Sequence, residues 1–188
     1  MDFLEVRRQL VHMAGGILLV ILLYLDLLDF RSIALLLLIS SIVFFLAKKR
    51  KLPLLNPLLK KLERKEYRKR FPGKGLIFYL LGAFVVVILF EKDIVLASIM
   101  ILALGDSVSP LVGRLGKIPH LFNKKKYFEG VLAGSIAGFI GALFFVAPIE
   151  AFLASFIAMI IEGMDLKVDD NLVLPVVASL IIWFLRLL

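Results

Sequence analysis

Two acidic residues fall inside otherwise apolar stretches of the chain. Asp106 and Glu162 each lie near the end of a run that reaches membrane-spanning length only by including the acid. A carboxylate in the hydrocarbon costs roughly 2.5–3.5 kcal/mol on insertion scales, so each one needs a partner, a cavity or a metal ion. With Asp169 and Asp170, these residues are candidate ligands of Mg²⁺, which takes few protein carboxylates. A structural salt bridge from Asp106 to Arg114 and a proton relay are the alternatives.

Basic residues suited to phosphate lie beside the same stretches. Arg114 and Lys126 follow Asp106 in one polar segment, and arginine favours bidentate contacts with phosphate oxygens. Pro72-Gly73-Lys74-Gly75 opens another apolar run, and glycines beside a lysine at a helix N-terminus can form an anion site. This is not a P-loop, because the GxxxxGK[ST] pattern is absent.

Two further polar groups are placed to join this site. Glu5, Arg8 and His12 follow at i, i+3 and i+7, so they form a charged stripe along one helix face. Asp169-Asp170-Asn171 opens the last apolar run. Acids favour helix N-termini for structural reasons, but this group also faces Glu162 across a short loop and can form a metal or phosphate site.

The elements that must position these residues are membrane helices. The chain has 188 residues, 61% of them hydrophobic, a mean hydropathy of +0.99 and no cysteine, which excludes an ordinary soluble domain, a disulfide framework and thiolate chemistry. We expect one all-α domain over residues 1–188, a polytopic membrane helical bundle of about seven transmembrane helices. The expected spans are residues 9–28, 32–47, 75–90, 94–110, 131–147, 149–163 and 172–188.

The distribution of basic residues predicts the orientation. With a cytoplasmic N-terminus and an external C-terminus, all of the 23 Lys and Arg residues face inward except Arg31, Lys92 and Arg186. The inner segment 48–74 is strongly basic, and from Asn56-Pro57 onward its leucines follow helical spacing. It therefore predicts an interfacial amphipathic helix on an anionic membrane surface rather than a nucleic-acid site.

Counting along the predicted helices sets the depth of the polar residues. At about 1.5 Å per residue, Asp106, Glu162 and His12 lie about 18, 20 and 21 Å from the outer ends of their helices. They are therefore expected at one depth, near the cytoplasmic face. Gly130, Gly134 and Gly138 recur every four residues, which predicts close helix packing. Of these three glycines, only Gly130 is placed to approach a phosphate.

Taken together, these motifs resemble the CTP-dependent lipid kinases, a group that includes dolichol kinase, phytol kinase and CTP-using diacylglycerol kinase. The resemblance extends to the phosphatidate cytidylyltransferases. The matching elements run in family order across most of the chain: Glu5-x-x-Arg8-x-x-x-His12, Pro72-Gly73-Lys74-Gly75, Gly105-Asp106 with Gly113-Arg114, Lys126-x-x-Glu129-Gly130-x-x-Ala133, and Glu162 followed by Asp169-Asp170-Asn171-x-x-x-Pro175.

The resemblance implies transfer of the γ-phosphoryl group of CTP to a polyprenol- or dolichol-like alcohol, giving CDP and a lipid phosphate, with Mg²⁺ or another divalent metal. It assigns catalysis to Asp106, His12 and Glu162, with Asp106 or His12 as the base. The metal ligands would be Asp106, Glu162, Asp169 and Asp170. The nucleotide and its phosphates would be bound by Arg8, Lys74, Gly75, Gly105, Arg114, Lys126, Glu129, Gly130 and Asn171. A homo-oligomer is compatible with this reading.

Two other functions use the same residues. A cytidylyltransferase acting on a lipid phosphate would attack the α-phosphorus of CTP and release pyrophosphate. An ion- or proton-coupled transporter would use the buried carboxylates directly, and it predicts polar residues that continue to the outer side.

Overall fold

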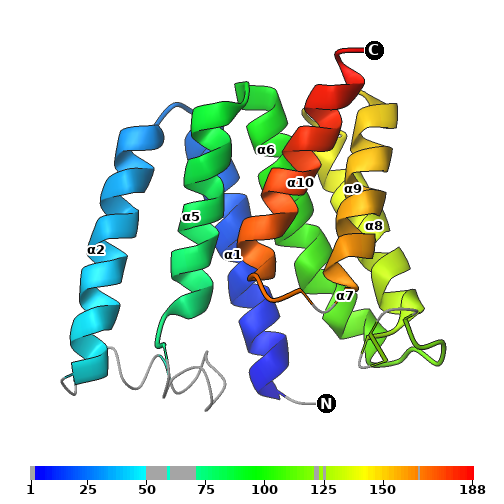
Figure 1. The fold of residues 1–188 in the computed structure, drawn as a ribbon, viewed down its shortest axis with the longest axis horizontal. Helices are drawn as coiled ribbons and strands as arrows, with labels where there is room; N and C mark the ends of the chain where they lie inside the picture. Colours follow the sequence, from blue (N-terminus) through cyan, green and yellow to red (C-terminus); the bar gives the residue numbers. More distant parts are fainter. Residues whose placement is uncertain (1–2, 50–58, 60–70, 121–122, 125, 165) are drawn as a thin grey trace.

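A computed structural model describes residues 3–49, 59, 71–120, 123–124, 126–164 and 166–188, and in these ranges it is helical apart from its connections (Figure 1). One isolated β-bridge joins Pro119 and Tyr127. The helices are α1 (Phe3–Tyr24), α2 (Phe30–Lys49), α5 (Lys74–Leu89), α6 (Lys92–Met100), the π-helix η1 (Ile101–Gly105), α7 (Asp106–Gly113), α8 (Phe128–Ala142), α9 (Pro148–Glu162) and α10 (Asp170–Leu185).

The expected all-α bundle is confirmed. Because α6, η1 and α7 follow one another without a break, the described helices form seven segments that match the seven expected spans. Three segments are long and apolar enough to cross a membrane: Phe3–Tyr24, Phe30–Lys48 and Lys92–Gly113. The two chain ends lie at opposite ends of the bundle (Figure 1). Which end faces the cytoplasm stays a prediction.

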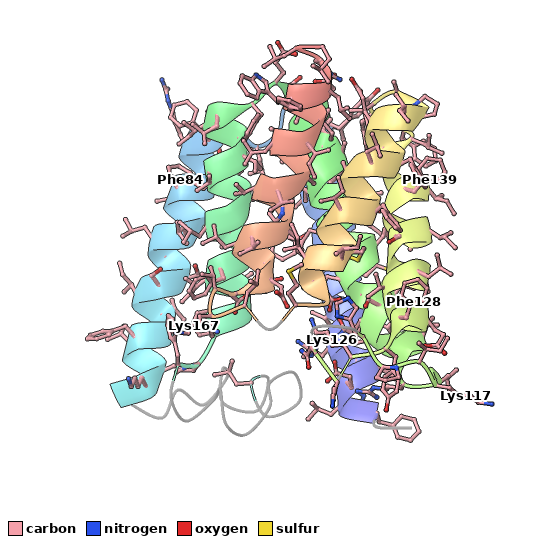
Figure 2. The ribbon with its side chains drawn as sticks, turned by 45° about the vertical axis from the view of Figure 1, so that its right-hand side comes forward. Phe84, Lys117, Lys126, Phe128, Phe139 and Lys167 are labelled. Carbon is pink, nitrogen blue, oxygen red and sulfur yellow. The ribbon has the colours of Figure 1, made fainter. Side chains whose placement is uncertain are left out.

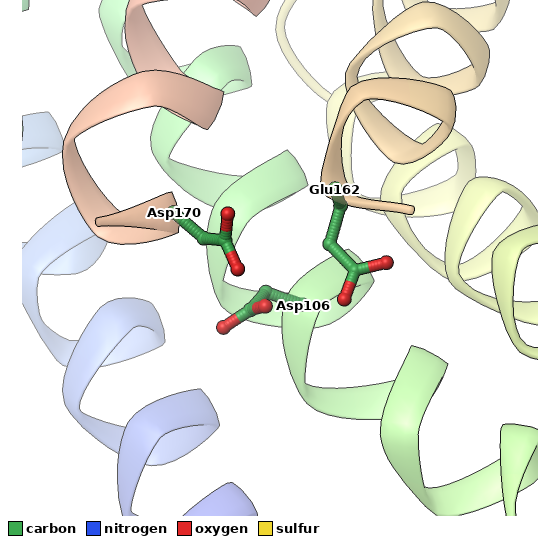
Figure 3. Close-up of side chains that lie close together, drawn as sticks. All are labelled: Asp106, Glu162 and Asp170. Carbon is green, nitrogen blue, oxygen red and sulfur yellow. The ribbon is translucent and has the colours of Figure 1, made fainter. Parts of the chain in front are cut away.

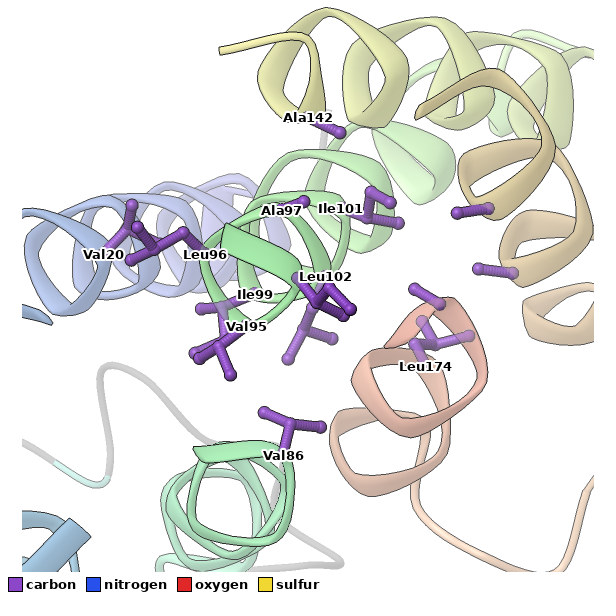
Figure 4. Packing of buried hydrophobic residues seen from close by; sticks show 14 of the residues in the cluster. Val20, Val86, Val95, Leu96, Ala97, Ile99, Ile101, Leu102, Ala142 and Leu174 are labelled. Carbon is purple, nitrogen blue, oxygen red and sulfur yellow. The ribbon is translucent and has the colours of Figure 1, made fainter. Parts of the chain in front are cut away.

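The segment formed by α6 and η1 is the centre of the bundle. Ile99, Ile101 and Leu102 have no exposed surface, and Figure 4 shows them between side chains of the surrounding helices, such as Val86 of α5 and Leu174 of α10. In contrast, α2 packs on α5 at the edge and exposes most of its large apolar side chains. Such a surface is expected where a helix faces lipid, because lipid chains are as apolar as the side chains.

The glycines of α8 bring helix backbones into contact. An added Cβ at Gly134 would lie 2.7 Å from Met159 Sδ and 2.8 Å from the carbonyl oxygen of Gly105. At Gly138 it would lie 2.5 Å from Ser155 Oγ. The predicted close packing is therefore confirmed, and it holds η1 and α9 against α8.

The basic segment 48–74 contributes little to the described structure. Most of the predicted interfacial helix, including its start at Asn56-Pro57, lies outside the described residues. Leu59 is described and is buried. The interfacial helix therefore stays a prediction.

Candidate active site

Three carboxylates from three helix ends meet at one point in the bundle. Asp106 begins α7, Glu162 ends α9 and Asp170 begins α10. One oxygen from each lies within 4.8 Å of the others, and Figure 3 shows the three groups turned toward a common centre. Carboxylate oxygens are the hard donors that Mg²⁺ and Ca²⁺ prefer, so this group could hold one divalent cation. Asp169, the fourth predicted metal ligand, pairs instead with Lys74, with 3.0 Å between Nζ and Oδ2.

The π-helix η1 immediately precedes Asp106. Single turns of π-helix insert one extra residue into an α-helix and are frequent at functional sites. Here the turn ends at Gly105, where an added Cβ would lie 2.9 Å from Met159 Sδ and 3.2 Å from the Gly134 carbonyl oxygen. Gly105 is thus enclosed by neighbouring helices. It allows close packing at this point, whereas sequence reasoning expected it to approach the nucleotide.

Lys126 supplies the positive charge beside the carboxylates. Its Nζ lies 2.6 Å from Glu162 Oε1 and 3.7 Å from Asp170 Oδ2, and it also donates a hydrogen bond to the Glu162 carbonyl. Burial by itself would lower the pKa of Lys126, but the charges of Glu162 and Asp170 outweigh it and raise the pKa above its usual range. Lys126 is therefore a permanent cation, and it lies at the lower end of the bundle in Figure 2.

The segment before α8 is folded back so that Lys126 reaches the cluster. His120 N–H donates to the Lys126 carbonyl at 2.8 Å, next to the bridge between Pro119 and Tyr127. Glu129 closes this turn by accepting hydrogen bonds from the backbone N–H groups of Lys117 at 2.7 Å and Ile118 at 3.2 Å. The Glu129 carboxylate, a predicted nucleotide contact, thus holds the turn that carries Lys126.

Ser109 is a site residue that sequence reasoning missed. Its hydroxyl, on α7, donates to Glu162 Oε2 at 3.2 Å, and both side chains are buried. Gly130, predicted near a phosphate, packs here as well, since an added Cβ would lie 2.6 Å from the Ser109 carbonyl oxygen. No sequence signal distinguishes this serine from other small residues in apolar helices.

His12 approaches the cluster from α1. Its Nε2 lies 3.5 Å from Asp106 Oδ2, so two of the residues predicted at one depth are in contact. The His12 ring stands edge-on to Tyr79 of α5, with ring centroids 4.9 Å apart. Tyr79 was not a predicted site residue.

The starts of α5 and α10 are joined beside the cluster. Asn171 Nδ2 donates to the Gly75 carbonyl at 3.3 Å, while Lys74 pairs with Asp169. An added Cβ at Gly75 would meet only Asn171 Nδ2, at 3.8 Å. These predicted residues therefore form one polar group next to Asp170.

Two arginines share a buried carboxylate near the start of α1. Glu5 is 1% exposed and pairs with Arg8 of its own helix and with Arg114, whose Nη2 lies 3.6 Å from Oε2. Gln9 also donates to Glu5, at 2.9 Å. Among the described residues, the ion pair of Arg114 is thus with Glu5 and not with Asp106, the partner considered from the sequence. Both arginine side chains remain more than one-third exposed.

The fold and the site define a helical membrane protein with a carboxylate cluster and several cations at one end of its bundle. Over 189 residues, the chain is 31% identical to an uncharacterized protein of Methanocaldococcus jannaschii, covering 95% of this chain and 92% of the relative. The chain belongs to the family of that protein. No protein-family model matches the chain, and no solved structure does.

Two named relatives are more distant. The chain is 27% identical over 208 residues to CTP-dependent diacylglycerol kinase 1 of Eremothecium gossypii, covering 94% of this chain and 65% of the kinase. It is 27% identical over 150 residues to the protein of the same name in Schizosaccharomyces pombe, covering 70% and 66%. The chain thus spans about two thirds of the length of each kinase.

Proposed function

We propose that this protein is a CTP-dependent lipid kinase that transfers the γ-phosphoryl group of CTP to the hydroxyl of a membrane lipid alcohol. The observation that carries the proposal is the meeting of Asp106, Glu162 and Asp170 around Lys126. The similarity to two CTP-dependent diacylglycerol kinases supports CTP as the donor and a lipid as the acceptor.

The reaction is one displacement at phosphorus. The oxygen of the lipid hydroxyl forms a bond to the γ-phosphorus, the bond from that phosphorus to the β,γ-bridging oxygen breaks, CDP leaves, and the hydroxyl proton passes to a base. Such transfers need positioning and charge neutralisation more than covalent chemistry by the protein. Residues that hold charges in place are therefore enough for most of the catalysis.

The carboxylates would hold the metal and Lys126 would neutralise phosphate charge. Asp106, Glu162 and Asp170 would bind a divalent cation, and Asp169 would support Lys74 beside it. Such an ion, when bound, supplies charge stabilisation for the phosphate oxygens. Lys126 already lies against two of the carboxylates, so it would contact a phosphate that the same metal holds.

The remaining cations would bind the outer phosphates and the nucleotide. Arg8 and Arg114 are held by Glu5 in fixed positions, which reduces the entropy lost when they contact a polyphosphate. Lys74 and Asn171 would contribute from the opposite side, at the starts of α5 and α10.

His12 and Asp106 are the candidates for the base. Both lie at the point where the hydroxyl of a lipid would meet the nucleotide, since Asp106 belongs to the cluster and His12 Nε2 is 3.5 Å from it. An orientation with this end toward the cytoplasm, as the positive charges predict, would give CTP direct access.

For the acceptor we propose a polyprenol- or dolichol-like alcohol, with diacylglycerol as the alternative that the names of the two kinases suggest. A cytidylyltransferase would use the same cluster but attack the α-phosphorus. A transporter is disfavoured because the charged groups described at the far end pair with one another, where Arg186 contacts Glu91, Asp93 and Glu150.

A product assay tests the proposal. Purified protein in detergent receives Mg²⁺, CTP labelled at either the γ- or the α-phosphate, and polyprenol, phytol, diacylglycerol or phosphatidate in turn. The proposal predicts γ-label in an alcohol-derived lipid, together with CDP. Alpha-label in lipid with release of pyrophosphate would establish the cytidylyltransferase. If CTP binds and neither label enters any lipid, the kinase proposal is wrong.

A further inference from the structure

The buried hydroxyl of Tyr79 contributes no hydrogen bond to the described part of the fold. The side chain is 7% exposed, and its Oη has no hydrogen-bond partner among the described residues. A buried hydroxyl without a partner costs about 1–3 kcal/mol, so a phenylalanine would satisfy the packing better. The hydroxyl is therefore available to hydrogen-bond a ligand.

The hydroxyl lies where α1 and η1 approach each other. An ideal Cβ on Gly16 would lie 2.3 Å from Tyr79 Oη and 2.4 Å from Ala103 Cβ. Gly16 is thus the residue that leaves room for the tyrosine hydroxyl between these elements. Gly15, the neighbouring glycine, has nothing within 4 Å of such a Cβ.

A second unpaired polar atom belongs to the ring that Tyr79 contacts. His12 lies one helical turn before Gly16, and its Nε2 also has no hydrogen-bond partner, although Asp106 Oδ2 is 3.5 Å away. The His12 ring stands edge-on to the Tyr79 ring, with ring centroids 4.9 Å apart. Two side chains in ring contact, one of them next to Asp106, therefore each carry a buried polar atom without a hydrogen-bond partner.

We infer that Tyr79 and His12 form a subsite for the acceptor hydroxyl, in which Tyr79 Oη hydrogen-bonds the alcohol oxygen of the lipid. This inference rests on the proposed function and names the residue that recognises the acceptor. The nucleotide groups, Lys126 and the arginines, lie at the other side of Asp106, toward the helix ends. An alcohol held by Tyr79 would thus reach Asp106 from within the membrane.

The test uses Tyr79→Phe, which removes one oxygen and keeps the ring against His12. Transfer of γ-label from CTP is measured against the mole fraction of lipid alcohol in mixed micelles. We expect kcat/KM for the alcohol to fall about 10-fold, the effect of one lost hydrogen bond. The KM for CTP should stay at the wild-type value, and the melting temperature without lipid should be equal to or higher than that of wild type, because an unpaired buried hydroxyl is removed. Tyr24→Phe, at the far end of α1, is the matched control.

A pair of glycine variants provides an independent check. Gly16→Ala displaces the Tyr79 hydroxyl and also presses on Ala103 of η1, so it should reproduce the defect toward the alcohol with a lower melting temperature, whereas Gly15→Ala should behave as wild type. The inference is wrong if Tyr79→Phe phosphorylates the alcohol as efficiently as wild type, or if its defect falls equally on CTP. Failure of the proposed function looks different, since then the wild-type protein itself transfers no phosphate to lipid.

Discussion

Asp106 is the residue that joins the two halves of the site. It is one member of the carboxylate cluster, and it is also the contact of His12 on the acceptor side. We expect Asp106→Asn to lower lipid phosphorylation by at least about 100-fold, because a neutral amide weakens metal binding and cannot accept a proton. The measurement is transfer of γ-label, with thermal unfolding as the control for folding. Normal turnover in this variant would remove Asp106 from the mechanism.

Lys126 is the cation on which the buried Glu162 depends. Glu162 is 4% exposed, so Lys126→Met leaves its carboxylate without the partner that now lies at 2.6 Å. We expect a lower melting temperature and a higher KM for CTP, because removing one member of a buried ion pair leaves an uncompensated charge. The double variant with Glu162→Gln should be less destabilised than the two single effects added together. Additive effects would contradict the pairing.

The raised pKa of Lys126 gives this interaction a pH dependence with a definite sign. A lysine whose pKa is higher in the folded protein stabilises it fully below the unfolded value of about 10.4, and the contribution is lost as pH rises through the folded value. Melting temperatures of wild type and Lys126→Met should therefore show this contribution disappearing only above about pH 10.4, and a change in the difference at lower pH would reflect the carboxylates that Lys126 contacts.

At the scale of elements, one turn positions Lys126 and one π-helix positions Asp106. The turn from Lys117 to Tyr127 carries Lys126 to the cluster, and Glu129 anchors it through two backbone N–H groups. The π-helix η1 places Asp106 where α7 begins, opposite the end of α9. The turn thus brings a cation to the cluster, and the π-helix is followed directly by one of its carboxylates.

Glu129→Ala tests the role of this turn. We expect the KM for CTP to rise several-fold and the backbone amides of Lys117 and Ile118 to exchange hydrogen faster, even without CTP, because their acceptor is gone. Glu129→Gln keeps an acceptor oxygen and should lie between alanine and wild type. If the KM for CTP rises while the amide exchange of Lys117 and Ile118 stays unchanged, Glu129 contacts the nucleotide directly.

At the scale of the whole molecule, the two ends of the bundle differ in how their charged residues are arranged. The cluster, Lys126 and the arginines gather toward the end that holds the N-terminus (Figure 1). At the other end, hydrogen bonds from Arg186 to Glu150 and Asp93 raise the pKa of Arg186 and tie α6, α9 and α10 together. Charged groups are thus paired at both ends, but among the described residues only the site end gathers three carboxylates within 4.8 Å of one another.

The predicted orientation is testable because the chain has no cysteine. We expect Lys117→Cys to react with a membrane-impermeant maleimide only in inside-out vesicles, and Arg31→Cys only in right-side-out ones. This follows from the excess of positive charge that the sequence places on one side. The opposite labelling pattern would put the site outside, where no CTP pool is expected, and would contradict the proposed donor.

The sequence by itself determined the helices and their approximate ends, because hydropathy is a local property of the chain. It also determined the close packing of α8, since small residues at every fourth position allow it wherever the helix lies. It did not determine which polar side chains meet, because that depends on the rotation of each helix about its axis. The motifs named Asp106, Glu162, Asp169 and Asp170 as joint metal ligands, but only the tertiary structure showed that oxygens of Asp106, Glu162 and Asp170 lie within 4.8 Å of one another while Asp169 pairs with Lys74. It also paired Arg114 with Glu5, turned Glu129 toward the backbone and left the hydroxyl of Tyr79 buried beside His12.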